Sequence, residues 1–181
     1  MEFKELDIDG LFEINLKPHV DERGFFMRTF DNNEFKNNEL QRDWVQENHS
    51  RSEKKGIIRG LHFQVEPYSE TKLVRCIRGK IFDVAVDLRK GSKTFGKWHG
   101  VFLSEENKKM FFIPRGFAHG FCTLTDISEV VYKVDNFYSP EHERGLLWND
   151  PDIAIEWPVT NPILSIKDQK NMTFKSFIEH G

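Results

Sequence analysis

Hydrophobic and polar residues alternate with a period of two along much of the chain, which is the pattern of β-strands that bury one face. The clearest example is Lys72–Leu88, which turn-forming residues interrupt at Arg78–Lys80. In its second half the even-numbered residues of Phe82–Leu88 are all apolar, whereas the odd-numbered residues of Ile81–Asp87 are mixed. We expect the apolar face to pack in a core and the mixed face to be able to line a cavity.

Seven further short segments carry the same signal, and turn-forming residues separate them. These predicted strands are Leu11–Leu16, Phe25–Phe30, Ile57–Phe63, Trp98–Leu103, Lys109–Ile113, Gly120–Leu124 and Glu129–Val134. Helical patterns are few and lie at Asn33–Leu40, at a turn near Ser104–Asn107 and over Ser165–Glu179. Many short strands with helix only at the margins predict an all-β fold, a β-sandwich or barrel. Because no repeat or low-complexity linker divides the chain, we expect residues 1–181 to form one domain.

Composition and charge limit the partners that we expect the protein to bind and the compartment in which we expect it. The chain has 26 basic and 29 acidic residues, interspersed along its length, so we expect no nucleic-acid partner. No segment approaches the roughly 18 apolar residues of a membrane span. Acidic residues occupy the N-terminus, where a signal peptide is apolar, so we expect a cytoplasmic protein with no membrane partner. Cys76 and Cys122 lie in apolar strand-like runs, which favours reduced, buried thiols over a disulfide.

The segment Gly56–Gln64, GIIRGLHFQ, places an arginine and a histidine inside an otherwise apolar strand. Arg59 and His62 are separated by an odd interval, so a regular strand directs them to opposite faces. Gly60 between them can host a β-bulge, which turns both side chains toward one cavity. A buried guanidinium requires an anion, which is either a ligand or a carboxylate such as that of Asp83.

Two of the seven histidines, His62 and His119, lie beside glycine and aromatic residues in apolar runs. Each is either a hydrogen-bonded core residue or part of a site, and the sequence leaves both interpretations open. The other five are expected on the surface or in loops: His19, His49, His99, His142 and His180. A histidine-rich metal site in a β-barrel usually needs a second histidine near the first. Phe63 and Gln64 occupy those positions, so we expect no metal ion.

Nine motifs follow one another over nearly the whole chain. They are DERGFF (Asp21–Phe26), VQENHS (Val45–Ser50), RGLHFQ, KLVRCIRGKIFDVAVDLRKGS, IPRGFAHGF (Ile113–Phe121), VVYK, YSPEHERG, WNDPDIAIEWP and ILSIKD (Ile163–Asp168). In these motifs and in their order the chain resembles the dTDP-4-dehydrorhamnose 3,5-epimerase family. The resemblance implies a cupin-type jelly roll and an enzyme without a cofactor. It would invert C3 and C5 of a nucleotide-linked 4-keto-6-deoxyhexose, in the favoured case dTDP-4-dehydro-6-deoxy-D-glucose, to give dTDP-4-dehydro-L-rhamnose.

The resemblance also implies which residues transfer protons. His62 is implied as the base, Asp168 as the partner that fixes its tautomer, and Tyr132 as the acid on the opposite face of the sugar. Lys72 is implied near the C4 oxygen, where a cation stabilises an enolate. His119 is implied either there or at the diphosphate.

Further residues are implied to bind the nucleotide sugar. Arg23 and Arg59 match diphosphate-binding arginines, a role that suits bidentate donors. The other matching positions are Phe26, Gln46, Asn48, Tyr138, Glu143 and Lys167. Arg28, also at a nucleotide-binding position, stands where many members carry glutamate, which makes thymine less certain as the base. Members are homodimers in which an N-terminal segment crosses to the partner, so Arg23 and Phe26 are expected to serve the neighbouring pocket.

Other functions stay open on the sequence alone. One is an epimerase that inverts only C3, and another is an epimerase that takes a GDP-linked heptose. Two more belong to different classes, a metal-dependent cupin oxygenase and a non-catalytic cupin that binds sugars. The number of inversions depends on how the acid and the base are placed around the sugar ring, which residue types do not specify.

Overall fold

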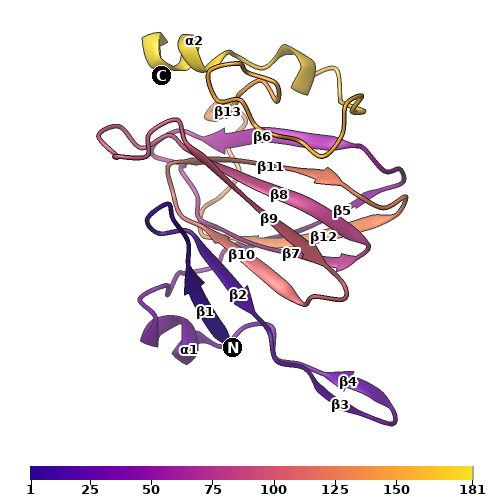
Figure 1. Cartoon of the computed structure of the whole chain (residues 1–181). Coiled ribbons are helices and arrows are strands. Elements are labelled where there is room, and N and C mark those ends of the chain that lie inside the picture. Colours follow the sequence, from indigo (N-terminus) through magenta and orange to yellow (C-terminus); the bar gives the residue numbers. More distant parts are fainter. Residues whose placement is uncertain (181) are drawn as a thin grey trace.

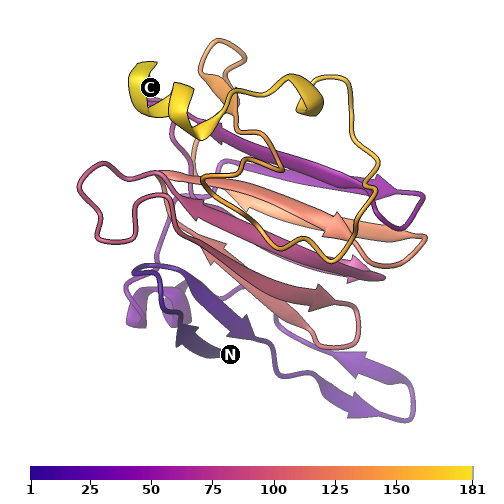
Figure 2. The same ribbon diagram turned by 45° about the horizontal axis from the view of Figure 1, so that its top comes forward.

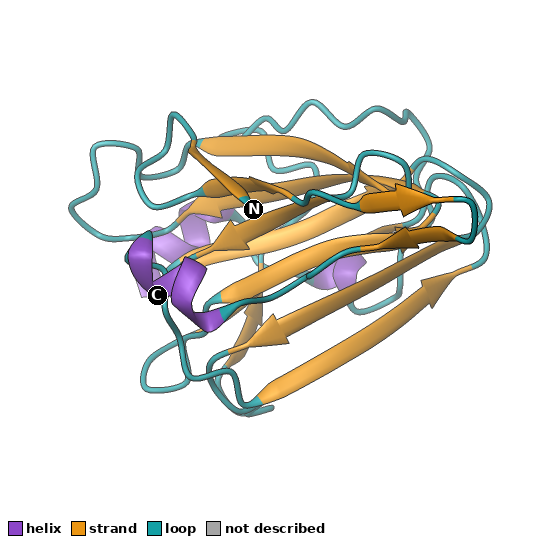
Figure 3. Cartoon of the chain, turned by 90° about the horizontal axis from the view of Figure 1, so that it is seen from below, coloured by secondary structure: helices purple, strands orange, loops and turns teal. Residues whose placement is uncertain are grey.

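Two antiparallel sheets face each other in the computed structural model, which describes residues 1–180 (Figure 1). One sheet has the strand order β1-β2-β10-β7-β12-β5 and the other β13-β6-β11-β8-β9. The strands are β1 (Glu2–Glu5), β2 (Phe12–Asn15), β3 (His19–Asp21), β4 (Gly24–Phe26), β5 (Gln46–Ser52), β6 (Ile58–Gln64), β7 (Lys72–Arg78), β8 (Lys80–Asp87), β9 (Trp98–Ser104), β10 (Lys109–Ile113), β11 (Phe117–Thr123), β12 (Ser128–Val134) and β13 (Glu143–Gly145). Helices lie only at the margins, so the predicted all-β fold is confirmed (Figure 3).

Apolar side chains from both sheets fill the interior of the barrel, because alternate residues of each strand point inward. On β8, Ile81 and Ala85 belong to this interior cluster, together with Val74 from the facing sheet. Phe82 and Val84 point the other way and pack in a second cluster. β8 is therefore buried on both faces, and its mixed face lies inside the barrel.

The C-terminal segment forms the cover of the five-stranded sheet (Figure 2). Phe174 and Phe177 of α2 (Phe174–His180) pack on the outer face of that sheet, where Phe63 contacts Phe177 edge to face. Burial of such aromatic side chains contributes roughly 1.5–3 kcal/mol each. The residues just before α2, which include Asp168, lie beside β6 of that sheet.

The predicted helix over Ser165–Glu179 is wrong, because the chain forms two short helices there. A 3₁₀-helix, η1, spans Asp168–Lys170, and α2 begins at Phe174. Between them Met172 pairs as an isolated parallel bridge with Leu146, and its N–H donates to the carbonyl of Gly145. Strand-like pairing with a distant segment thus replaces helix in the middle of the predicted range.

Four strands were not predicted, namely β1, β3, β5 and β13. They are short or polar, and β5 carries the sequence QENHSRS at the edge of the six-stranded sheet. Edge strands expose one side and need no apolar alternation. The predicted strand Phe25–Phe30 ends at Phe26, and the predicted helix Asn33–Leu40 is α1 (Asn32–Asn37), capped by Asp31.

β3 and β4 form a hairpin that projects from the barrel and does not join either main sheet (Figures 1 and 2). Every residue of both strands is exposed, including Val20 and Phe26, whose relative exposures are 76% and 69%. Apolar residues this exposed on a projecting arm are typical of a surface that contacts another chain.

Cys76 and Cys122 are buried and unpaired, as the sequence predicts. Burial raises the pKa of Cys76 to about 12 and that of Cys122 to about 11, so both thiols stay protonated at neutral pH. Within residues 1–180, no helix has the length and apolar character needed to cross a membrane.

Candidate active site

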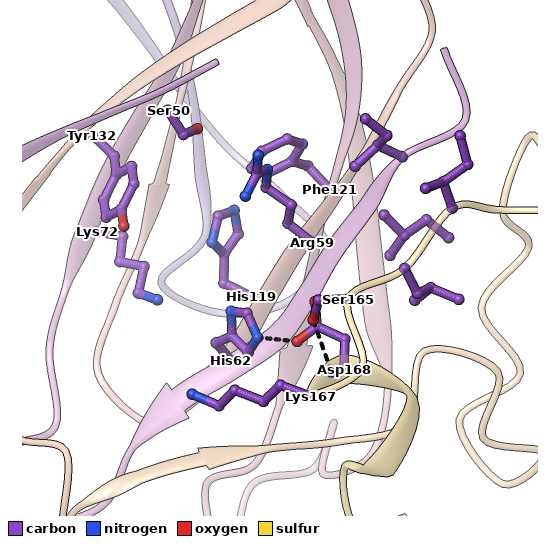
Figure 4. A pocket seen from close by; sticks show the side chains of 14 residues that line it. Ser50, Arg59, His62, Lys72, His119, Phe121, Tyr132, Ser165, Lys167 and Asp168 are labelled. Atoms are coloured by element: carbon purple, nitrogen blue, oxygen red, sulfur yellow. Dashed lines mark hydrogen bonds and ion pairs between the residues drawn. The ribbon is translucent and has the colours of Figure 1, made fainter. Parts of the chain in front are cut away.

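A cavity of about 480 Å³ opens between the two sheets beside the C-terminal segment (Figure 4). Its titratable lining residues are Arg59, His62, Lys72, His119, Tyr132, Lys167 and Asp168, all of which the sequence predicts as site residues. They come from β6, β7, β11, β12 and the segment around η1. Residues more than a hundred positions apart therefore meet in one pocket.

The predicted bulge at Gly60 is confirmed by the pairing of β6 with β11. His119 pairs with His62 and Phe121 with Arg59, so three steps along β6 lie opposite two along β11. The extra residue brings Arg59 and His62 to the same cavity. A Cβ on Gly60 would lie 2.6 Å from the Cα of Gly120, so only glycine fits at this contact.

His62 forms a hydrogen bond with Asp168, with 2.6 Å between Nε2 and Oδ1. Asp168 begins η1 and is 4% exposed, and its N–H donates to the Oγ of Ser165 at 3.0 Å. Burial raises the pKa of Asp168, but hydrogen bonds and charge from His62, with help from Ser165 and the Gly60 amide, outweigh burial and lower the pKa overall. Asp168 is thus an anion that holds the imidazole from one side.

A second imidazole–carboxylate pair lies deeper in the pocket. His119 Nε2 is 2.7 Å from Oδ1 of Asp83, and Asp83 is completely buried on β8. The expected alternative that Asp83 pairs with Arg59 is wrong. Arg59 is exposed, and it donates instead to the Oγ of Ser52 and to the carbonyl of Arg51. Arg59 lines the cavity, and its side chain forms no ion pair with a carboxylate within residues 1–180.

Tyr132 and Lys72 lie on the opposite wall, which the six-stranded sheet forms (Figure 4). Burial, followed by the charge of Glu70, raises the pKa of Tyr132, so its hydroxyl stays protonated at neutral pH. Lys72 is 7% exposed, and its ammonium is 3.2 Å from Oε1 of Glu70. A phenol and a cation therefore face the His62–Asp168 pair across the cavity.

Several predicted nucleotide-sugar residues gather near the pocket. Tyr138 donates its hydroxyl hydrogen to Oε2 of Glu143, and Lys167 contacts the same oxygen at 2.6 Å. Burial raises the pKa of Glu143, but Lys167 and Tyr138 outweigh it and lower the pKa overall. Gln46 accepts a hydrogen bond from the Tyr138 N–H, and Asn48 pairs with Tyr132 along β5.

Seven predicted residues do not line this cavity within one chain. Four of them are the residues near the pocket named above, Gln46, Asn48, Tyr138 and Glu143, and the other three lie in the projecting hairpin or just after it. Arg23 forms an ion pair with Asp21 in the projecting hairpin, and Phe26 is exposed on β4. Arg28 forms an ion pair with Asp31 at the start of α1, 3.1 Å apart. The expected contact of Arg23 and Phe26 with a neighbouring pocket involves a second chain, and it stays a prediction, as does the role of Arg28 at the nucleotide.

Sequence reasoning missed several lining residues, among them Ser50, Phe121 and Ser165. Gln46, Asn48 and Ser50 are alternate residues of β5, so recognition of β5 as a strand would have placed all three on one face. Ser165 lies three residues before Asp168, a spacing typical of a serine that caps the following turn.

Two facing antiparallel sheets around a pocket of titratable side chains place the protein in the class of cupin-type jelly-roll enzymes. The family model described as dTDP-4-dehydrorhamnose 3,5-epimerase matches residues 5–176. The chain belongs to this family and is an isomerase that acts on sugars.

The relatives support this assignment over most of the chain. The dTDP-4-dehydrorhamnose 3,5-epimerase of Shigella flexneri is 58% identical over 155 residues, which are 85% of each protein. The crystal structure of the enzyme of the same name from Bacillus anthracis, with TDP and PPi bound, is 44% identical. It superposes with a TM-score of 0.93 over 95% of this chain and 98% of that chain.

A structure with a different stated activity is also similar. ChmJ, a 3'-monoepimerase from Streptomyces bikiniensis in complex with dTDP-quinovose, is 32% identical. The TM-score is 0.89, and the match covers 96% of this chain and 88% of that one. The fold is therefore shared by proteins described as inverting one carbon and by proteins described as inverting two.

Proposed function

We propose that the protein inverts C3 and C5 of dTDP-4-dehydro-6-deoxy-D-glucose and forms dTDP-4-dehydro-L-rhamnose. The observation that carries this proposal is the placement of His62 and Asp168 on one wall of the cavity and Tyr132 on the facing wall. Inversion requires that a proton leave one face of the sugar and another arrive on the opposite face. A base and an acid on facing sheets supply this geometry.

Each inversion proceeds through an enolate. His62 takes the proton from the carbon beside the C4 ketone, and the electron pair of the C–H bond moves into the enolate. Asp168 holds the imidazole in the required tautomer and stabilises it as it gains charge. Tyr132 then gives its hydroxyl proton to the opposite face of the same carbon, and the ketone re-forms. Exchange of protons with water restores His62 and Tyr132 before the second carbon reacts.

The enolate oxygen needs positive charge or hydrogen-bond donors in a site that excludes water. Lys72 lies on the Tyr132 side of the pocket with most of its surface buried, and His119 lines the same cavity. We assign Lys72 to the C4 oxygen and His119 to the same region. A fixed ammonium there contributes most as the negative charge develops, which lowers the barrier to proton removal.

The diphosphate is assigned to Arg59, whose guanidinium faces the cavity without a carboxylate partner within residues 1–180. We propose that Arg23 and Phe26 reach the nucleotide from a second copy of the chain, as the exposed projecting hairpin suggests. Mixing Arg23→Ala subunits with His62→Ala subunits tests this exchange. If Arg23 serves the neighbour, mixed dimers regain one complete pocket and about half the activity. If it serves its own chain, the mixture stays inactive.

Incorporation of deuterium from D2O, followed by NMR, tests the proposed reaction directly. We expect exchange at both C3 and C5 of the dTDP-linked ketosugar. Exchange at C3 alone would favour the single inversion that the ChmJ description states. Tighter binding of GDP than of dTDP would favour the other nucleotide. No exchange with any nucleotide-linked 4-ketosugar would contradict the proposal.

A further inference from the structure

The inner side of β5 presents a row of four polar residues to the pocket side of the sheet: Gln46, Asn48, Ser50 and Ser52. The two ends of this row are already engaged. Gln46 accepts a hydrogen bond from the Tyr138 N–H at 2.8 Å, and Ser52 accepts one from Nε of Arg59 at 3.1 Å. The middle of the row is therefore the part that is free to meet a ligand.

Ser50 is the unusual member of this row. Its Oγ is buried, yet no group within residues 1–180 forms a hydrogen bond with it. A buried hydroxyl without a partner is destabilising by about 1–3 kcal/mol, so such groups call for an explanation. Ser50 also lines the cavity, beside the residues assigned to the reaction. Its hydroxyl can rotate about one torsion angle to meet a group that enters the pocket.

The position of Ser50 along β5 indicates which part of the substrate it meets. The preceding inward residue, Asn48, pairs with Tyr132, and the following one, Ser52, binds Arg59. Ser50 thus lies between the proposed acid and the proposed diphosphate arginine, as Figure 4 shows. In the substrate the diphosphate is on C1 and proton transfer occurs at C3 and C5, so the atoms between them are C2 and the ring oxygen. Of these two atoms only C2 carries a hydroxyl, which can both donate and accept a hydrogen bond.

We propose that Ser50 is a specificity-determining residue that forms a hydrogen bond with the C2 hydroxyl of the hexose. This inference rests on the proposed function. It names a substrate contact that distinguishes 2-hydroxy sugars from 2-deoxy sugars. A site built to bind a hydroxyl rejects an analogue without it, because the protein group is then left unpaired.

The test compares kcat/KM for the 2-hydroxy substrate and for its 2-deoxy analogue, in the parent protein and in Ser50→Ala. We expect the parent to prefer the 2-hydroxy sugar by roughly tenfold. We expect Ser50→Ala to lose most of this preference through slower reaction of the 2-hydroxy sugar alone. Because both substrates are measured with one preparation, the ratio does not depend on the folded fraction.

His49→Ala provides the matched control, because His49 directly precedes Ser50 on β5 and its side chain contacts Glu129 on the other side of the sheet. It should keep the parent preference. The proposal is overturned if Ser50→Ala slows both substrates equally, or if it weakens binding of dTDP alone by tenfold, which would place Ser50 at the phosphates. If the parent turned over neither sugar, the proposed function itself would fail, a result distinct from a lost preference.

Discussion

The pocket contains two imidazole–carboxylate pairs with nearly equal hydrogen-bond lengths but different surroundings. Nε2 of His62 is 2.6 Å from Asp168, and Nε2 of His119 is 2.7 Å from Asp83. The side chain of His62 is 33% exposed, whereas that of His119 is 8% exposed. Asp168 has further partners in Ser165 and the Gly60 amide, whereas Oδ2 of Asp83 has none within residues 1–180.

The two pairs differ in burial, and we expect this difference to give them different roles. The pair of His62 is open to the cavity and to water, so it can exchange protons during each reaction cycle. The pair of His119 is enclosed by β6, β8 and β11, where breaking it would leave a charged group in a medium of low dielectric constant. We therefore expect the His62–Asp168 pair to serve proton transfer and the His119–Asp83 pair to provide fixed polarity.

The largest expected effect is the loss of activity when the more exposed pair, His62–Asp168, is broken. His62→Ala should lower kcat about 100 to 10,000-fold, because it removes the proposed base. Binding of dTDP, measured by calorimetry, should change little, since the nucleotide is assigned to other residues. His49→Ala, on an exposed histidine of β5, is the control and should keep full activity. More than a tenth of the parent activity in His62→Ala would exclude His62 as the base.

The next largest effect is a loss of stability when the buried pair, His119–Asp83, is broken. His119→Leu leaves the fully buried Asp83 unpaired and should lower the free energy of unfolding by about 3–5 kcal/mol. Adding Asp83→Asn removes the isolated charge and should restore more than half of this loss. His62→Leu should cost far less, because Asp168 keeps its other partners. Urea unfolding measures all three, and equal losses for His119→Leu and His62→Leu would remove the distinction between the pairs.

A smaller effect is expected at acid pH, where the contribution of Asp168 to stability should be lost. The pKa of folded Asp168 lies below its ordinary value of 3.8. A carboxylate with a lowered pKa contributes stability above the unfolded pKa, and this contribution is lost as pH falls through the folded pKa. Stability of the parent should therefore decline below about pH 4. In Asp168→Asn the free energy of unfolding should depend less on pH there, and an unchanged pH profile would contradict this account.

Much of the fold followed from alternation of apolar residues, because most strands bury at least one face. β8 is an example: the mixed face predicted to line a cavity carries Asp83, which lies inside the barrel against His119. The bulge at Gly60 could also be predicted, since an arginine and a histidine at an odd interval needed it to share a cavity. The strand β5 could not be predicted, because an edge strand of polar residues gives no periodic apolar signal.

The site depends on contacts that no local pattern contains. Asp168 reaches His62 across 106 positions, and it became a candidate only through the family resemblance. The predicted long helix around Asp168 failed because Met172 pairs with Leu146, which ends η1 before α2 begins. Tertiary pairing thus coincides with the boundary between the two short helices, which a local pattern could not predict.

The smallest expected effect concerns Ser165, which positions the exposed pair and has no counterpart at the buried one. The Asp168 N–H donates to its Oγ at 3.0 Å, so Ser165→Ala removes this hydrogen bond in the turn that leads into η1 and loosens Asp168. Loss of one such hydrogen bond costs about 0.5–1.5 kcal/mol, and we expect kcat to fall about threefold to tenfold with dTDP affinity unchanged. Ser165→Thr keeps the hydroxyl and should restore the rate, whereas Ser176→Ala on α2 should change neither quantity. An unchanged kcat in Ser165→Ala would show that Asp168 is held by the strand pairing around it and that the serine is dispensable.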